Sequence, residues 1–88
     1  MAKVSWSFNI DGNPHIIVLE HKGWSGTRTI TLDGRLVMKV EHSNNNGNVY
    51  QFDAFGNRCT VSVSTWFLPC QYGLEVDGVP IPEDAILE

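Results

Sequence analysis

The segment VSWSFNIDG (residues 4–12) alternates apolar with polar side chains and ends on an Asp-Gly pair. Val4, Trp6 and Phe8 recur at every second position, which places them on one face of an extended strand. Tight hairpin turns prefer Asp-Gly because Gly12 adopts a positive φ at no steric cost. The segment therefore predicts a half-buried strand that turns directly into an antiparallel partner.

The same pattern returns 44 residues later in the chain, where Phe8 is matched by Phe52 and Gly12 by Gly56. Apolar positions between these identities agree as well. The remaining identical pairs in this register are Asn13 with Asn57, Asp33 with Asp77 and Gly34 with Gly78. An unbroken register of this kind predicts two half-repeats, residues 1–44 and 45–88, that share one hydrophobic core.

Period-two alternation continues through both halves, and no segment shows a helical period over ten residues. We expect strands near residues 3–10, 15–21, 27–32, 35–41, 48–54, 58–65 and 71–76, with a short piece at 79–81. Each half then forms an antiparallel meander, and the two sheets pack face to face about 10 Å apart. The predicted fold is an all-β, non-interleaved antiparallel β-sandwich of about seven or eight strands in a single domain, residues 1–88. Its expected core residues are Trp6, Phe8, Ile17, Leu19, Ile30, Leu32, Tyr50, Phe52, Val61, Leu74 and Val76.

Charge and composition narrow the partners that we expect. The 88 residues carry a formal net charge of −4, and residues 59–88 contain acidic side chains but no basic ones. Nucleic-acid binding needs a surplus of Lys and Arg, so we expect no nucleic-acid partner. No apolar stretch approaches the roughly 18 residues of a membrane span, so we expect no membrane partner. We interpret the acidic C-terminal part as a solubility feature.

The two cysteines also bear on location. Cys59 and Cys70 are expected at opposite ends of one strand, on the order of 20 Å apart, which is too far for a disulfide bond. Unbridged cysteines agree with a reducing compartment, and we expect a soluble cytoplasmic protein.

A search for reactive groups yields little. His15 and His21 lie six residues apart on one strand face, roughly 20 Å from each other, so they cannot share a metal ion within one chain. The run Gly23-Trp24-Ser25-Gly26 lacks the final glycine of a nucleophile elbow. We therefore expect no metal, no cofactor and no enzymatic activity.

Apolar residues at positions where polar ones are usual are better candidates for function. Trp66, Phe67 and Leu68 fall in a predicted loop, and the equivalent loop in the first half holds Trp24. These side chains either cover an open end of the sandwich or form a patch that binds a partner. On another strand Ile16 and Val18, with Val37 nearby in the sheet, face away from the expected core. That outer face predicts either a homodimer contact or simple partial exposure.

Several motifs resemble the Fas apoptosis inhibitory molecule family. They are HIIVLEH (residues 15–21), SGTR (25–28), LDG (32–34), Trp6-x-Phe8 and YGLEVDG (72–78), so that the resemblance spans roughly residues 4–81. Animal members carry two tandem repeats, whereas this chain resembles one. The positions matched to the family are His15, Glu20, His21, Ser25, Gly26, Arg28, Asp33 and Gly34.

The resemblance implies a non-interleaved β-sandwich and a cytosolic, non-catalytic protein that acts through protein contacts. It also implies roles in the restraint of death-receptor signalling and in protection against protein aggregation. No chemistry attaches to the matched positions. Arg28 shares the inward parity of Ile30 but stands at a strand end, where we expect it to pair with Glu20 or to extend into water.

Taken together, these features predict a non-enzymatic protein-interaction module whose partner is unknown. The alternative is a small-ligand or carbohydrate-binding β-sandwich, in which the loop aromatics stack on the ligand.

Overall fold

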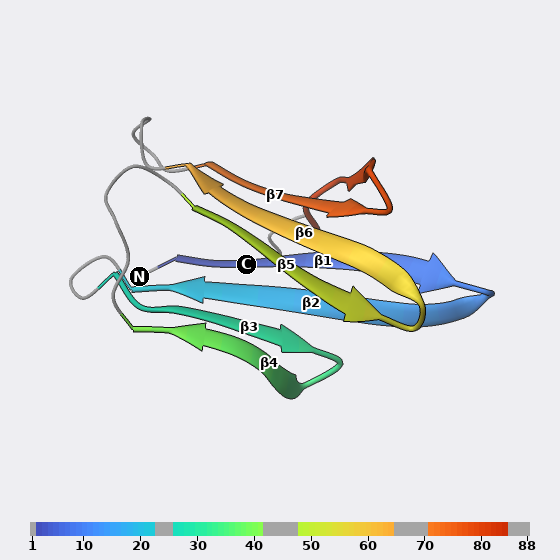
Figure 1. The fold of residues 1–88 in the computed structure, drawn as a ribbon, viewed down its shortest axis with the longest axis horizontal. Coiled ribbons are helices and arrows are strands. Elements are labelled where there is room, and N and C mark those ends of the chain that lie inside the picture. The colour runs from blue at the N-terminus through green and yellow to red at the C-terminus, as the bar shows by residue number, and fades with distance from the viewer. Residues whose placement is uncertain (1, 23–25, 42–47, 65–70, 85–88) are drawn as a thin grey trace.

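The protein is an all-β sandwich, seen here in a computed structural model that describes residues 2–22, 26–41, 48–64 and 71–84. Two four-stranded antiparallel sheets are formed in strict chain order, β1-β2-β3-β4 and β5-β6-β7-β8 (Figure 1). The strands are β1 (Ala2–Ile10), β2 (Asn13–His21), β3 (Arg28–Leu32), β4 (Arg35–Val40), β5 (Asn48–Ala54), β6 (Asn57–Ser64), β7 (Gln71–Val76) and β8 (Val79–Ile81). The predicted non-interleaved fold is thereby confirmed.

All four tight turns lie at one end of the sandwich, which we term the hairpin end (Figure 1, right). Each turn has two central residues with positive φ, such as 52° at Asp11 and 81° at Gly12. This is the type I′ geometry, whose twist matches that of the two strands it joins. The opposite end, which we term the open end, is where β2 ends at His21 and β3 begins at Arg28. It is also where β6 ends and β7 begins.

The core lies between the two sheets and is formed by the inward residues of both. Its buried members are Trp6, Ile17, Leu19, Ile30, Ala54, Cys59, Val61, Val63 and Leu74. Every residue expected in the core is either in this set or packed against it. Ala54, Cys59 and Val63 were not among the expected residues. Cys59 is a free thiol, as predicted, and burial raises its pKa.

The two sheets are compatible with the predicted half-repeats, but they are not identical. The pairing of β5 with β6 repeats the pairing of β1 with β2 residue for residue, 44 positions later. The next pairing differs, because Ile17 lies opposite Leu32 whereas Val61 lies opposite Leu74, two residues before the counterpart of Leu32. The register between β2 and β3 in the first sheet therefore differs by two residues from the register between β6 and β7 in the second.

A β-bulge in β4 corrects one expectation. Ile30 lies opposite Met38 and Thr31 lies opposite Leu36, so Val37 is an extra residue on β4. Val37 packs against the core, and its predicted place on the outer face is wrong. Leu36, which is 62% exposed, lies there instead. A one-residue insertion reverses the face on which the following side chains lie, and period-two reasoning from sequence misses it.

Candidate functional site

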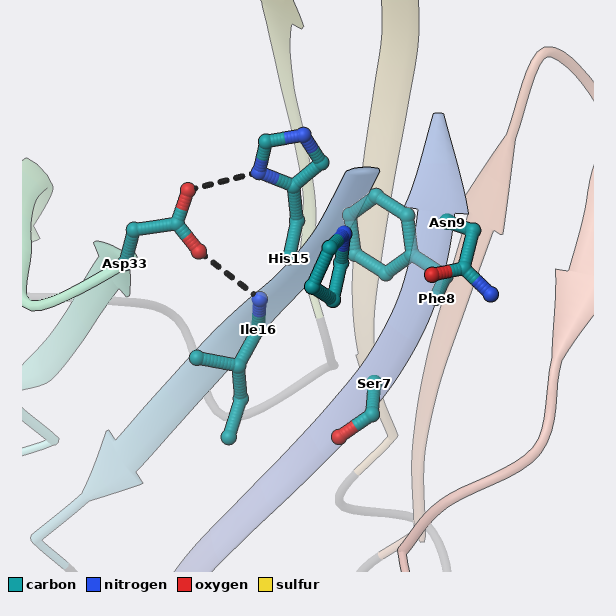
Figure 2. A pocket seen from close by; sticks show the side chains of 7 residues that line it. Ser7, Phe8, Asn9, His15, Ile16 and Asp33 are labelled. Carbon is teal, nitrogen blue, oxygen red and sulfur yellow. Dashed lines mark hydrogen bonds and ion pairs between the residues drawn. The ribbon is translucent and has the colours of Figure 1, made fainter. Parts of the chain in front are cut away.

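An open groove of about 310 Å³ lies at the hairpin end, on the first sheet (Figure 2). Strand β1 and strand β2 form its walls, and the turn between β3 and β4 supplies one further residue. Its lining residues are Ser7, Phe8, Asn9, Pro14, His15, Ile16 and Asp33. The groove thus combines an aromatic ring, an aliphatic side chain and several hydrogen-bonding groups, a mixture common in binding sites.

Asp33 fixes the geometry of this groove. Its carboxylate accepts a hydrogen bond from His15 Nδ1 at 2.7 Å and another from the Ile16 backbone N–H at 2.9 Å (Figure 2). The Asp33 N–H in turn donates to the Ile16 carbonyl at 2.9 Å. The hydrogen bond from His15, followed by that from Ile16, lowers the pKa of Asp33 below its ordinary value. The carboxylate is therefore ionised at neutral pH and holds His15 and Ile16 in place.

The second sheet contributes a ring at the same end. Phe55, in the turn between β5 and β6, stacks on His15 with 4.2 Å between ring centroids and 24° between planes. Its φ is 53°, a conformation that bulky side chains rarely adopt and that costs on the order of 1–3 kcal/mol. Asp11 occupies the equivalent turn position in the first half. The strained Phe55 backbone therefore brings its ring over His15 and links the two sheets.

Ser7, His15 and Asp33 have the residue types of a catalytic triad, but their geometry differs from one. Ser7 lies opposite Ile16 and shares its face, whereas His15 projects from the other face of β2. The Ser7 hydroxyl donates to the Asp84 carboxylate at 2.9 Å, and the described residues show no hydrogen bond between Ser7 and His15. This arrangement positions side chains and does not couple a nucleophile to a base.

The segment after β8 crosses to the edge of the first sheet. The Asp84 N–H donates to the Ser5 carbonyl at 2.9 Å, and its carboxylate accepts from the hydroxyls of Ser5 and Ser7 and from the Ser7 N–H. Burial by itself raises the pKa of Asp84. The hydrogen bonds from Ser5 and Ser7 together lower it by more, so that the pKa lies below its ordinary value. Sequence reasoning missed this role and read the acidic segment as a solubility feature. The one sequence feature that could have indicated this contact is the pair of serines, Ser5 and Ser7, on the outer face of β1.

A second polar cluster lies between the sheets at the open end. His21 and Arg28 are cross-strand partners at the ends of β2 and β3, and both side chains are buried. Tyr72 on β7 approaches them from the other sheet, with 2.9 Å between its hydroxyl and His21 Nδ1. The two rings meet edge to face at 5.8 Å. We term His21, Arg28 and Tyr72 the open-end cluster.

Arg28 corrects another expectation, because it neither pairs with Glu20 nor reaches water. Its residue is 2% exposed, and Glu20 lies on the outer face, 3.9 Å from Lys3 Nζ. Within the described residues, neither Nε nor Nη1 of Arg28 has a hydrogen-bond partner. The pKa of His21 is lowered, first by burial and then by the neighbouring Arg28 charge. The guanidinium is therefore buried beside the His21 imidazole with two of its three nitrogens unpartnered.

The remaining predicted site residues divide as follows. Ile16 is 38% exposed in the groove, and Val18 is half-buried on the same outer face. Gly26 (φ 69°) donates its N–H to the Lys22 carbonyl, and Gly34 (φ 82°) completes the turn after Asp33. Trp24, Ser25, Trp66, Phe67 and Leu68 lie outside the described residues, so the predicted loop patch is not placed.

The positions matched to the family in the sequence form two separate groups, one at each end of β2. His15, Asp33 and Gly34 lie at the hairpin end, and His21 and Arg28 lie at the open end. Across the described ranges, no three His, Cys, Asp or Glu side chains are placed to hold a metal ion.

A β-sandwich of two consecutive four-stranded meanders, with polar clusters at both ends, defines the class of this protein. The family model described as Fas apoptotic inhibitory molecule (FAIM1) matches residues 2–83, and the chain belongs to this family. Comparisons with curated proteins and with solved structures returned no match. No helix in the described part of the chain is long and apolar enough to cross a membrane.

Proposed function

We propose that this chain is a non-catalytic, apoptosis-inhibiting module that acts in the cytoplasm by binding a protein partner at the hairpin-end groove. Membership in a family described as Fas apoptotic inhibitory molecules supports the apoptotic role. The observation that carries the choice of surface is Ile16, an aliphatic side chain that remains 38% exposed within a groove. Protein interfaces concentrate their binding energy in apolar anchors surrounded by polar groups.

The groove is also held rigid before any partner arrives. Asp33 hydrogen-bonds both the His15 ring and the Ile16 backbone, and Phe55 covers His15 from the other sheet. A pre-organised surface loses little conformational entropy on binding, which favours affinity. Val18 continues the apolar side of β2 that begins with Ile16.

The test replaces Ile16 while leaving the fold intact. We would express the wild type, Ile16→Ser and Leu36→Ser in cultured cells, stimulate Fas and measure the surviving fraction. Leu36 is the matched control, because it is an exposed aliphatic residue of the same sheet outside the groove. The wild type and Leu36→Ser should protect cells, and Ile16→Ser should not, with the Tm of all three proteins within a few degrees.

Two outcomes would contradict the proposal. If the wild type gives no protection, the apoptotic role is wrong. If Ile16→Ser protects as well as the wild type, the partner does not bind at the groove. Sedimentation of the same proteins at high micromolar concentration separates self-association from partner binding, because a homodimer through Ile16 and Val18 would be lost in Ile16→Ser alone.

A small-ligand or carbohydrate site is the second candidate function. Phe8 and His15 line the groove with their rings 6.1 Å apart, and Asn9 adds an amide to its lining, so that aromatic and hydrogen-bonding groups meet there (Figure 2). A Tm increase with one member of a sugar panel, lost in Phe8→Leu, would favour this candidate.

A further inference from the structure

Arg28 carries a charge that the fold does not balance. The residue is 2% exposed, and within the described chain its Nε and Nη1 atoms have no hydrogen-bond partner. A buried polar group without a partner costs free energy, and a buried charge costs more unless it is paired. A buried polar group of this kind calls for a partner beyond the fold, such as ordered water, an ion or a ligand group, and a charged one calls most for an anion.

The nearby carboxylates of the chain are already used. Glu20, which precedes His21 on β2, lies beside Lys3, and Glu41, which follows β4, lies 3.5 Å from Lys39 Nζ. Of the sequences that connect strands at the open end, residues 22–27, 41–47 and 65–70, only the second contains an acidic residue, and that residue is Glu41. The anion that would pair with Arg28 therefore comes from outside these connections.

We infer that Arg28 is the receptor for a single carboxylate group of a bound ligand, with His21 and Tyr72 beside it. A planar guanidinium matches a planar carboxylate and forms strong charge-assisted hydrogen bonds with it. The cluster supplies one positive charge, because the His21 imidazole is buried and next to Arg28. One positive charge balances a carboxylate, whereas a phosphate dianion would leave a negative charge uncompensated.

This site is independent of the proposed groove. Arg28 and Ile16 belong to opposite ends of the sandwich, so variants at one leave the other unaltered. Failure of the cell-protection test would not affect the carboxylate site, and failure of the carboxylate test would not affect the groove.

The experiment titrates ¹⁵N-labelled wild-type protein with sodium acetate and follows the side-chain Nε–Hε resonances of its arginines. The Arg28 resonance is assigned by its absence in Arg28→Lys. We expect it to shift saturably with acetate. It should not shift with acetamide, which has the same shape and no charge, and inorganic phosphate should bind more weakly at equal ionic strength. An N-acetylated dipeptide with a free carboxylate, compared with its amide, distinguishes a peptide terminus from a small acid as the source.

Variants complete the test. In the Arg28 variants the backbone amide resonances of His21 and Tyr72 report acetate binding instead; Arg28→Met should weaken it at least about tenfold, as expected for loss of a charge-assisted hydrogen bond, and Arg28→Lys should weaken it less. Arg58→Met is the matched control, because Arg58 is exposed on β6 and pairs with Asp53 at 2.8 Å; it should bind acetate like the wild type. If the Arg28 resonance of the wild type does not move, or moves equally with acetamide, the inference is wrong. Tighter binding of phosphate than of acetate would also overturn it.

Discussion

The two ends of β2 each carry a histidine, and the fold treats the two histidines in opposite ways. At the hairpin end His15 donates to the Asp33 carboxylate, which also accepts the Ile16 N–H. At the open end His21 lies beside Arg28 and contacts the Tyr72 hydroxyl, and Arg28 forms no ion pair with a carboxylate of the described residues. One end therefore has a carboxylate with its hydrogen-bond donors in place, and the other has a buried guanidinium with two unpartnered nitrogens.

The difference follows from how each end is built. At the hairpin end, type I′ turns need residues that tolerate positive φ, and Asp is one of the few that do. Asp33, in the turn between β3 and β4, therefore places a carboxylate next to His15 near the start of β2. The open end has no such turn among the described residues, and the only acidic residue in the connections there is Glu41, which lies beside Lys39. The distribution of charge is thus a consequence of turn chemistry.

The largest expected effect comes from truncating Trp6, the core residue that lies between the two ends. Trp6 is fully buried midway along β1, and Trp6→Ala should lower the free energy of unfolding by about 3–5 kcal/mol through lost burial and the cavity left behind. Urea denaturation measures the change. Leu36→Ala, at an exposed position, should stay within about 0.5 kcal/mol of the wild type. A loss below 1 kcal/mol for Trp6→Ala would show that the core lies elsewhere.

The second prediction acts on the open end alone. Arg28→Met keeps an unbranched side chain, although a shorter one, and removes the unpaired charge, so we expect the free energy of unfolding to rise by about 1–3 kcal/mol in the absence of ligand. Arg58→Met should show no such gain, because Arg58 is exposed. Denaturation of the three proteins in acetate-free buffer makes the comparison. Destabilisation by Arg28→Met would mean that the guanidinium is already satisfied in the fold.

The third prediction separates the ends by pH. The pKa of His21 is lowered from 6.5, so the unfolded chain binds more protons than the fold below that pH, and stability is full above pH 6.5 and falls below it. The pKa of Asp33 is lowered from 3.8, so its contribution is full above pH 3.8 and is lost as pH falls through the folded value. Thermal denaturation across pH should show both losses.

Variants assign each loss to its end. His21→Gln should remove the loss that begins below pH 6.5 and leave the acid one, and Asp33→Asn should do the reverse. Arg28→Met should reduce the His21 loss, because the Arg28 charge contributes to lowering that pKa. Unchanged pH profiles in both His21→Gln and Asp33→Asn would break the proposed contrast between the ends.

The smallest expected effect concerns the strained turn at Phe55. Phe55→Asn relieves the cost of a positive φ in a bulky residue, but it loses the stack on His15, which is worth about 0.5–1.5 kcal/mol. These terms offset each other, and we expect a net change within about 1 kcal/mol by urea denaturation. Asp11→Asn, in the equivalent turn, should be neutral. A larger loss would show that the stack outweighs the strain.

Local patterns were sufficient to predict most of the fold. Alternation in residues 4–10 and the Asp-Gly pairs predicted β1, its turn and its partner, because strand faces and type I′ turns depend on neighbouring residues. Val37 was misplaced, because the bulge in β4 depends on packing across β3 and leaves no mark in the alternation. Phe55 was not singled out, because its role is to stack on His15, which belongs to the other sheet.

The candidate site was predicted only in part. Ile16, His15 and Asp33 were all named in advance, but nothing in the spacing indicated that they would share one groove. Asp84 was missed for the same reason, because its partners Ser5 and Ser7 are almost the whole chain away.

The sequence by itself determined the strands, the turns and the division into two consecutive sheets, since each of these depends on the conformational preferences and polarity of residues close together in the chain. Only the tertiary structure decided which charges are paired. Whether Arg28 meets a carboxylate or lies unpaired beside His21 and Tyr72 depends on how two sheets pack and on the burial that follows. Electrostatic energy depends on distance and solvent exposure in space, and neither quantity is encoded in spacing along the chain.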